Sequence, residues 1–327
     1  MQALSQLSYT PAANTKLYEA ARTSANRARM SALAYRTRAL ARSAIIRHEL
    51  RSPESRLRNA MPLPPPRDPV DVDLSGRAIL VTGASGGLGR PLAMACARRG
   101  ATVVLHGRVV RKLEAVYDEI VAEGGPQPTI LPLDLAVASA EDFGQIAGAI
   151  RAQLGRLDGL VHTAAYLGSL GPIEHQSFDV WLKVLRVNLG AAMALTRSML
   201  PLLAAAPDAA VVLTLDTRGD DPRAYWGSYA AAKAGLSALA ATLADEWEGR
   251  ANLRVDAVVP GPMRSPLRAL THPGEDRAAL PLPEALMPLY LHLIGARAKA
   301  ESGARIDAQA WLAGQPASSP LVGAARP

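Results

Sequence analysis

The sequence predicts an α/β fold in which helices cover both faces of a doubly wound parallel sheet of about seven strands. Short β-branched or apolar runs alternate with helical windows between residues 76 and 312. Strands this apolar are buried on both faces, and strands separated by helices form parallel sheets. The expected strands are Ala78–Val81, Thr102–Leu105, Thr129–Leu131, Gly159–His162, Ala210–Leu215, Arg254–Val259 and Gly303–Ile306. The expected helical windows lie near 88–99, 110–123, 141–154, 178–205, 225–249 and 283–296.

The chain is long enough for one large domain. It has 327 residues, of which 49% are apolar, and this composition excludes general disorder. We expect a Pro-rich lead-in at 61–75, a single domain at 76–312 and a loose tail at 313–327. Apolar runs are too short for a membrane span. Cys96 is the only cysteine, which excludes an intramolecular disulfide and fits a reducing compartment.

The positive charge of the chain is concentrated at its start. Residues 1–60 hold 11 basic and 3 acidic side chains, against 36 and 29 in the whole chain, which leaves residues 61–327 with a net charge of −1. The expected domain therefore has no basic bias that would indicate nucleic-acid binding. We interpret the Arg/Ala-rich residues 1–60 as a disordered leader or as a stretch foreign to the native protein, with Met61 as the natural start. A mitochondrial transit peptide is the alternative.

The first expected strand leads into a glycine-rich loop that opens a helix. Gly83, Gly87 and Gly89 allow a tight turn, a close approach to a pyrophosphate and close helix–strand packing. Free N–H groups at the start of the helix then face the anion. In this context the pattern predicts a Rossmann-type dinucleotide site rather than a structural turn. The residues expected to bind the cofactor here are Thr82, Gly83, Ser85, Gly87, Leu88 and Gly89.

The end of the second expected strand indicates which dinucleotide binds. A site for NAD(H) places an acidic residue here, next to the ribose 2′-hydroxyl, but this chain has Gly107 followed by Arg108. A guanidinium suits a 2′-phosphate, so we expect NADP(H) to be preferred over NAD(H). The alternative is that Arg108 is only a solvated loop residue.

Tyr229 and Lys233 lie four residues apart in a strongly helical window, on one helix face. Such a pair is often structural. After the fifth strand of a dinucleotide fold, it can act chemically. An ammonium lowers the pKa of a nearby phenol, which then exchanges a proton with a substrate oxygen.

With these motifs in this order, residues 74–312 resemble the short-chain dehydrogenase/reductase superfamily. The segments 224–229, 243–247 and 287–291 resemble the bacterial YciK-like oxidoreductases within it. Members of that subgroup begin shortly before the glycine loop, which supports Met61 as the natural start. The motifs that support the resemblance are Thr82–Gly89, Asp134-Leu135, Asn188, Tyr229 with Lys233, and Pro260-Gly261 with Ser265.

The resemblance implies a role for each of these residues. Tyr229 would be the acid/base, Lys233 would hold the nicotinamide ribose, and Asn188 would anchor a water in a proton relay. Alternatively, Asn188 is a buried amide that braces its helix, and Asp134 is only a helix cap. The resemblance also implies a homodimer or homotetramer in the bacterial cytoplasm. The remaining cofactor contacts would come from Asp134 and Leu135 near the adenine, Ala164 after the fourth strand, and Pro260, Gly261 and Ser265 at the nicotinamide.

The chain departs from the family pattern at two places. Asp216 occupies the place of the serine that donates a hydrogen bond to the substrate oxygen, thirteen residues before Tyr229. An ionised aspartate cannot donate, and its charge raises the pKa of a nearby tyrosine. A protonated Asp216, or the hydroxyl of Thr214 or Thr217, would be the substitute donor. After the fourth strand, the family's Asn-Asn-Ala-Gly becomes His-Thr-Ala-Ala at 162–165.

These departures leave two function classes open. The first is an NADP(H)-dependent oxidoreductase acting on a small carbonyl or alcohol, with Tyr229 as acid/base. The second is a catalytically impaired protein that binds NADP(H) and acts by binding. The six histidines lack the paired spacing of a metal site, so no metal is expected.

Overall fold

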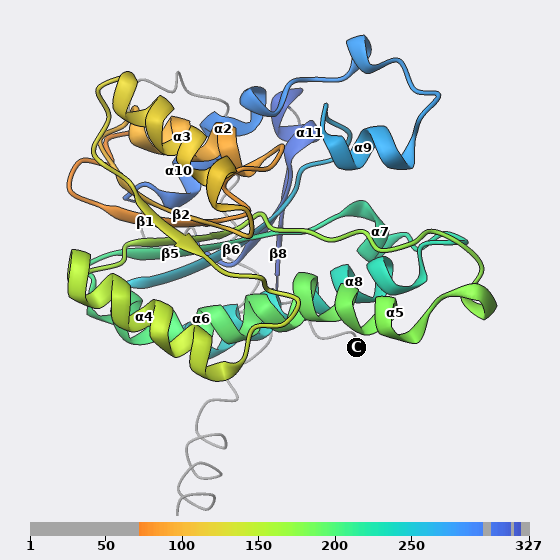
Figure 1. The fold of residues 1–327 in the computed structure, drawn as a ribbon, viewed down its shortest axis with the longest axis horizontal. Coiled ribbons are helices and arrows are strands. Elements are labelled where there is room, and N and C mark those ends of the chain that lie inside the picture. The colour runs from red at the N-terminus through yellow and green to blue at the C-terminus, as the bar shows by residue number, and fades with distance from the viewer. Residues whose placement is uncertain (1–71, 297–301, 315–316, 322–327) are drawn as a thin grey trace, which may run out of the picture. The chain divides into compact units, whose positions relative to one another are not determined.

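The computed structural model describes residues 72–296, 302–314 and 317–321. All of them belong to one unit, Arg58–Pro327. The predicted leader at 1–60 and residues 61–71 of the lead-in lie outside the described residues. The described part is a sheet between two layers of helices (Figure 1), as the sequence predicts.

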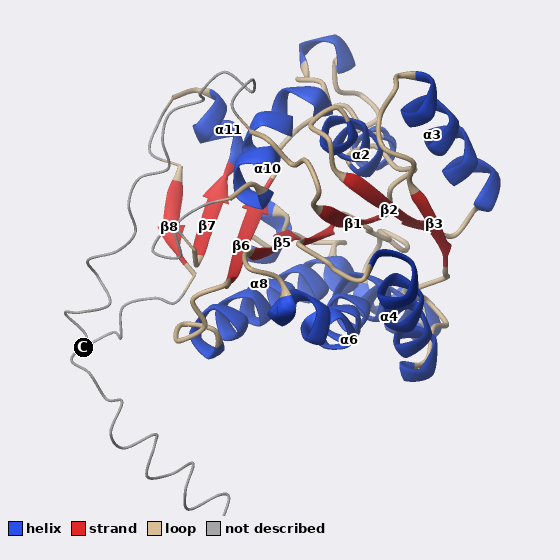
Figure 2. Cartoon of the chain, turned by 90° about the vertical axis from the view of Figure 1, so that its left-hand side faces the viewer, coloured by secondary structure: helices blue, strands red, loops and turns tan. Residues whose placement is uncertain are grey.

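The sheet has eight strands in the order β3-β2-β1-β4-β5-β6-β7-β8, seen from one end in Figure 2. All neighbours are parallel except β7 and β8. The chain crosses over between β3 at one edge and β4 beside β1, so β1 and β4 flank the topological switch point. The strands are β1 (Ala78–Thr82), β2 (Thr102–Gly107), β3 (Thr129–Pro132), β4 (Gly159–His162), β5 (Ala209–Thr214), β6 (Leu253–Val259), β7 (Ala304–Asp307) and β8 (Ser318–Pro320).

The eighth strand exceeds the predicted number of about seven and lies in the segment predicted as a loose tail. β8 pairs antiparallel with β7, with Ser318 opposite Ile306. Its three residues are two serines and a proline. Such a segment has neither the apolar run nor the length that indicates a strand in sequence.

Helices cover both faces of the sheet (Figure 2): α2, α3 and α10 lie on one side, and α4, α6 and α8 on the other. The strands alternate between these layers, because Ile79 and Val81 pack into one core and Leu80 packs into the other. The α-helices are α2 (Gly89–Ala97), α3 (Val110–Ala122), α4 (Ala140–Leu154), α5 (Phe178–Leu185), α6 (Ala191–Ala205), α7 (Thr217–Asp220), α8 (Gly227–Glu246), α9 (Pro266–Thr271), α10 (Met287–Ile294) and α11 (Ala308–Leu312).

The window predicted as one helix near 178–205 is interrupted. A π-helical turn, η4 (Arg186–Gly190), joins α5 to α6. Such turns are rare and often lie at functional sites. The combined segment Phe178–Ala205 is apolar and long enough to cross a membrane by composition alone. Its residues Leu195, Met199 and Leu202 belong to the core under the sheet, as in a core helix of an α/β domain.

Several short helices escape the sequence prediction. They are α7, α9 and α11, together with the 3-10 helices η3 (Ile173–His175) and η5 (Arg277–Ala279), whereas η6 (Pro283–Leu286) lies inside the predicted window 283–296. This last helix continues directly into α10. One or two turns are too short for an apolar periodicity, so sequence patterns detect them poorly.

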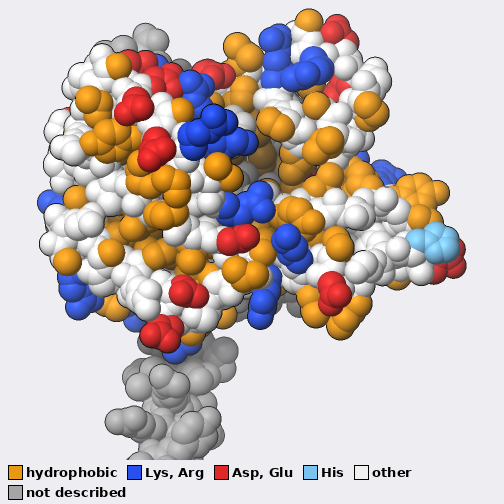
Figure 3. Space-filling view, viewed as in Figure 1, with side chains coloured by type: hydrophobic (Ala, Val, Ile, Leu, Met, Phe, Trp, Pro, Cys, Tyr) orange, Lys and Arg blue, Asp and Glu red, His pale blue; other side chains and the backbone are white. Residues whose placement is uncertain are grey.

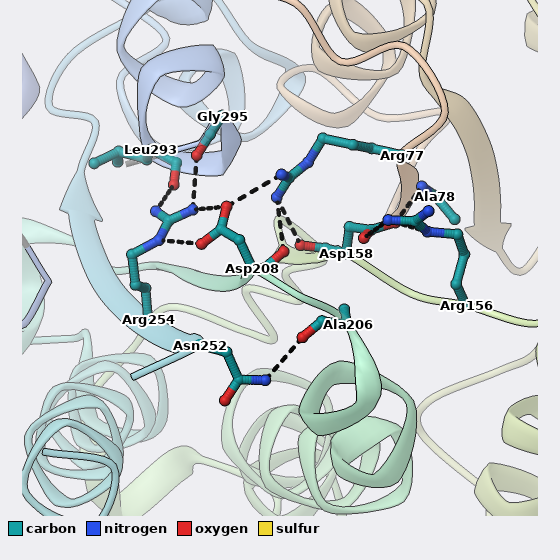
Figure 4. A network of polar contacts seen from close by, with 10 residues as sticks. All are labelled: Arg77, Ala78, Arg156, Asp158, Ala206, Asp208, Asn252, Arg254, Leu293 and Gly295. Atoms are coloured by element: carbon teal, nitrogen blue, oxygen red, sulfur yellow. Dashed lines mark hydrogen bonds and ion pairs between the residues drawn. The ribbon is translucent and has the colours of Figure 1, made fainter. Parts of the chain in front are cut away.

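A partly buried ion-pair network fastens the amino-terminal edge of the sheet (Figure 4). Arg254 on β6 is 1% exposed and donates to both carboxylate oxygens of Asp208, at 2.8 and 2.9 Å. It also donates to the carbonyls of Leu293 and Gly295 at the end of α10. Arg77 reaches Asp208 from the start of β1, at 3.1 Å. The network thus joins β1, β5, β6 and α10 at the edge opposite the carboxyl ends of the strands.

Arg254→Leu should lower the free energy of unfolding by about 1.5–3 kcal/mol, because it leaves the carbonyls of Leu293 and Gly295 unpaired and removes one of the two arginine partners of Asp208. Arg250→Leu, at an exposed position just after α8, is the matched control and should change it little. Denaturant unfolding measures both. Equal stabilities of the two variants would contradict the importance of the network.

The same network predicts a pH dependence of stability. Burial raises the pKa of Asp208, but the hydrogen bonds and charges of Arg254 and Arg77 lower it more, so it lies below its ordinary value of 3.8. The stabilisation is therefore complete above the unfolded pKa and is lost as pH falls through the folded pKa. Acid titration of the unfolding free energy should be shallower in Arg254→Leu than in the unmodified chain.

Candidate active site

The carboxyl ends of β1 and β4 approach each other closely at the switch point. The buried Thr82 hydroxyl accepts hydrogen bonds from the backbone N–H groups of Thr163 and Ala164, both at 3.1 Å. The Thr163 hydroxyl donates in return to the Thr82 carbonyl. A threonine at 163 therefore braces the neighbouring strand with its hydroxyl, although it lacks the amide of the family pattern.

Three glycines of the loop stand where a Cβ atom would come too close to neighbouring atoms. Gly83 has a φ of 66°, and a Cβ there would lie 3.0 Å from the Cα of Ala164. A Cβ on Gly89, the first residue of α2, would lie 2.2 Å from the Gly83 carbonyl oxygen. A Cβ on Gly87 would lie 3.2 Å from the Cβ of Ser265. The loop is thus a close backbone turn at a helix N-terminus, and Ser85 and the buried Leu88 lie within it.

The end of β2 lies beside this loop. Gly107 is buried, and a Cβ there would lie 3.0 Å from the Leu113 side chain. Arg108 is exposed and makes no hydrogen bond or ion pair with any described residue. Arg90, by contrast, pairs with Glu119 on α3.

Asp134 and Leu135 follow β3, as the sequence predicts. The Asp134 carboxylate accepts a hydrogen bond from the N–H of Ala136 at 3.0 Å, and Leu135 is buried. Asp134 also lines a groove of about 700 Å³ between this turn and the helical residues Leu185 and Leu189.

Tyr229 and Asp216 meet at the carboxyl end of β5. The Tyr229 hydroxyl donates to Asp216 Oδ2 at 3.2 Å. The other oxygen, Oδ1, caps α7 by accepting from the N–H of Arg218 at 2.9 Å. Burial, and then the Asp216 charge, raise the pKa of Tyr229 well above 10. Tyr229 is therefore a neutral phenol whose proton points at a carboxylate.

Lys233 lies one helical turn beyond Tyr229 and is 3% exposed. Its ammonium donates to the Thr214 carbonyl at 2.8 Å. Burial lowers the pKa of Lys233 to about 8, although Asp216 opposes this shift. The Thr214 side chain in turn shares a hydrogen bond of 3.0 Å with the buried Tyr290 hydroxyl on α10.

Backbone contact fixes α7 against α8. A Cβ on Gly219 would lie 2.9 Å from both the Ala234 nitrogen and the Lys233 carbonyl carbon. The element that holds Asp216 therefore packs directly on the helix that holds Tyr229 and Lys233.

Asn188 lies inside the π-helical turn and is 2% exposed. Its amide nitrogen donates to the carbonyls of Tyr166 and Val184, at 2.7 and 2.8 Å. Its amide oxygen accepts from the Tyr166 N–H at 3.2 Å. The side chain therefore braces the loop after β4 against the helix.

The segment after β6 turns sharply next to Gln309, a residue that no sequence motif indicates. Gln309 on α11 donates to the carbonyls of Pro260 and Pro262, at 2.7 and 3.2 Å. Gly261 between them has a φ of 68°. Ser265 caps α9 by accepting from the N–H of Arg268 at 3.0 Å. Gln309 and Pro260 are 49 residues apart, so no local spacing indicates this contact.

Aromatic side chains border Tyr229. The rings of Trp226 and Tyr229 lie 5.9 Å apart, and the ring of Trp226 lies 6.3 Å from that of His272. The Arg218 guanidinium lies 5.1 Å from the Trp226 ring centre. Tyr225 has a φ of 76°, which is uncommon for a residue other than glycine. Figure 3 shows a hollow between the region of α2 and α3 and that of α9.

Two buried histidines flank Thr82 in the sheet register, His106 on β2 and His162 on β4. His162 shares a hydrogen bond of 2.9 Å with Thr196. Burial lowers the pKa of His106 to about 4, and that of His162 to about 3 with help from nearby positive charge. Among the residues that the structure describes, no three His, Cys, Asp or Glu side chains gather as metal ligands would.

Comparisons with known proteins agree with this geometry. Residues 77–276 match the short chain dehydrogenase family model. The chain is 42% identical to the uncharacterized oxidoreductase YciK of Escherichia coli (strain K12) over 236 residues, which cover 72% of this chain and 93% of that protein.

Two crystal structures of similar proteins contain a nicotinamide cofactor. One is a short chain dehydrogenase from Escherichia coli CFT073 with NADPH (TM-score 0.71, 42% identity, 74% of this chain and 100% of the other). The second is a short chain dehydrogenase from Shigella flexneri 2a str. 301 with NADP (TM-score 0.69, 42% identity, 72% and 98%).

Asp216→Asn should lower the pKa of Tyr229, because it removes the neighbouring negative charge but keeps a residue that can cap α7. NMR of tyrosine labelled at the oxygen-bearing ring carbon measures this, with Tyr229→Phe for assignment. Asp118→Asn, at an exposed position on α3, is the control and should leave the titration unchanged. An unaltered Tyr229 titration in Asp216→Asn would disprove the coupling.

Proposed function

The chain belongs to the short chain dehydrogenase family, and from this premise we propose that it is an NADP(H)-dependent oxidoreductase in which Tyr229 is the acid/base. As a family member it is an NAD(P)-dependent enzyme that acts on CH–OH and C=O groups. The observation that supports the specific proposal best is the buried, neutral Tyr229 hydroxyl, 3.2 Å from Asp216 and one turn from Lys233.

The glycine loop fits a dinucleotide pyrophosphate. Gly83, Gly87 and Gly89 each stand where a Cβ would meet neighbouring atoms, so the backbone itself forms the cradle. The loop ends at the N-terminus of α2, whose free N–H groups favour an anion. Thr82, Ser85 and Leu88 complete the loop in this proposal.

Arg108 supports a preference for NADP(H). It is exposed beside the glycine loop, directly after Gly107, which occupies the position where an NAD(H) site has an acidic residue, and no described residue engages it. The relatives crystallised with NADPH and NADP support the same choice. The 2′-phosphate of NADP(H) would give the Arg108 guanidinium a charged partner.

The remaining cofactor contacts follow the family pattern. When bound, NADP(H) supplies or accepts the hydride. Asp134 and Leu135 would meet the adenine, and Ala164 would line the dinucleotide. Pro260, Gly261 and Ser265 would line the nicotinamide end, held in place by Gln309.

Tyr229 and Lys233 would handle the proton. The neutral phenol of Tyr229 can donate to the oxygen of a carbonyl substrate as that oxygen gains charge. The buried Lys233 would bind the nicotinamide ribose, and its charge would oppose the effect of Asp216 on the phenol. Asn188 would contribute by holding its helix and the loop after β4 in place around the site.

We further propose that the partners are a small-molecule substrate and a second copy of the chain. Large apolar side chains on α5 and α6 are exposed: Phe178 by 72%, Leu182 by 44% and Met193 by 46%. A homodimer or homotetramer would cover them. The relatives named above are bacterial, and we propose a cytoplasmic location.

Arg108→Ala should weaken NADPH binding about tenfold or more and leave NADH binding nearly unchanged, because it removes a charge-assisted contact to the 2′-phosphate alone. Calorimetry with both nucleotides measures this. Arg111→Ala, exposed on α3, is the matched control. An equal loss of affinity for NADPH and NADH in Arg108→Ala would contradict a contact between Arg108 and the 2′-phosphate.

Asp216→Ser should raise kcat/KM for ketone reduction with NADPH by roughly tenfold to a hundredfold, because serine donates a hydrogen bond where a carboxylate repels the developing oxyanion. Tyr229→Phe should abolish turnover but retain NADPH binding. Binding of NADPH without turnover in the unmodified chain and in Asp216→Ser would instead favour the binding protein.

A further inference from the structure

The carboxylate of Asp216 is an unusual group for a site that reduces carbonyls. It lies half-buried at the carboxyl end of β5, and its Oδ2 accepts only the Tyr229 hydroxyl among the described side chains. Its Oδ1 accepts from the N–H of Arg218 and, at 3.4 Å, from the Thr217 hydroxyl. A carboxylate has about four acceptor positions, so it retains capacity for a further donor.

No Lys or Arg among the described residues forms a direct ion pair with this carboxylate, although Lys233 and Arg268 lie near enough to interact with its charge. The nearby basic groups are engaged elsewhere. Lys233 donates to the Thr214 carbonyl, and Arg268 forms two hydrogen bonds of 2.6 Å with Glu275. Arg218 lies over the Trp226 ring and 3.8 Å from Asp221. No Lys or Arg nitrogen in the described segments lies within 4.0 Å of the Asp216 carboxylate, so its negative charge is available at the proton-transfer position.

The negative charge of Asp216 disfavours the reduction of a ketone but favours the binding of a protonated imine. Reduction of a ketone places negative charge on oxygen, which a carboxylate beside the proton donor opposes. A protonated imine carries positive charge on nitrogen, and its N–H is a donor. A nitrogen at the Tyr229 hydroxyl would come within reach of Asp216, 3.2 Å from that hydroxyl. The carboxylate therefore favours the cation over the neutral carbonyl.

The aromatic surroundings also suit a cation. Trp226 and Tyr229 present their rings 5.9 Å apart beside Asp216. Both rings already lie near a cation of the protein: the Arg218 guanidinium is 5.1 Å from the Trp226 ring centre, and Lys233 Nζ is 5.7 Å from that of Tyr229. Aromatic faces near a carboxylate are typical of sites for organic cations.

We propose that this site reduces C=N bonds of substrates that bind as iminium ions, with Asp216 as their counter-ion. The inference rests on the proposed function, because the hydride comes from the same cofactor. The iminium carbon forms a C–H bond with the hydride that NADPH supplies, and the π pair of the C=N bond becomes the nitrogen lone pair. The products are a neutral amine, which takes a proton from water, and NADP⁺.

The test compares substrates of matched shape in the presence of NADPH: pyrroline with cyclopentanone, and dihydroisoquinoline with tetralone. The full chain should reduce the imines. The ratio of kcat/KM for imine over ketone should fall at least tenfold in Asp216→Ser and Asp216→Asn, both of which can cap α7. Asp216→Glu, which keeps the carboxylate, and the exposed control Asp118→Asn should retain the ratio.

A binding measurement gives a second readout. Tetrahydroisoquinolinium should bind the complex with NADP⁺ at least tenfold more tightly than tetralol in the unmodified chain, and Asp216→Asn should remove this difference. Reduction of the ketones alone, or an imine-to-ketone ratio unaffected by Asp216→Ser, overturns the inference and leaves the proposed function intact. Intact NADPH binding without oxidation by any substrate overturns both.

Discussion

The parallel sheet, buried on both faces, is the constraint on which the rest of the structure depends. Because β1 to β7 run in one direction, their carboxyl ends share a single edge of the sheet, along which Thr82, Arg108, Ala164 and Asp216 lie. The opposite edge has a different role. There the ion pair between Arg254 and Asp208 joins strands and a helix, at the edge opposite the candidate active site. The two edges thus separate stability from function.

The interaction between Asp216 and Tyr229 links architecture with reactivity. One carboxylate oxygen of Asp216 caps the N-terminus of α7, and the other accepts the hydrogen bond of the Tyr229 hydroxyl. A serine could serve as the helix cap equally well, so capping does not explain the carboxylate. What the aspartate adds is charge, placed beside a phenol whose pKa burial already raises. The local electrostatics therefore differ from those of a site built for an oxyanion.

The sequence predicts most of the sheet, because its strands are apolar runs and its glycine loop has a recognisable spacing. It also places Tyr229, Lys233 and Asp216 in one site through family resemblance. Contacts between segments that are distant along the chain cannot be predicted from the sequence. No pattern indicates that Gln309 supports Pro260 or that β8 pairs with β7. The π-helical turn at Asn188 is hidden as well, since its residues continue the same apolar window as α5 and α6.

The packing of Gly219 on α8 has a consequence for how this site can diverge. Backbone contact at that glycine packs α7 directly on α8, and any side chain at 216 that can cap α7 is compatible with this packing. An exchange there alters the polarity seen by a bound molecule while the frame around it stays in place. If position 216 sets substrate choice as proposed, that choice can change there without remodelling of the surrounding helices.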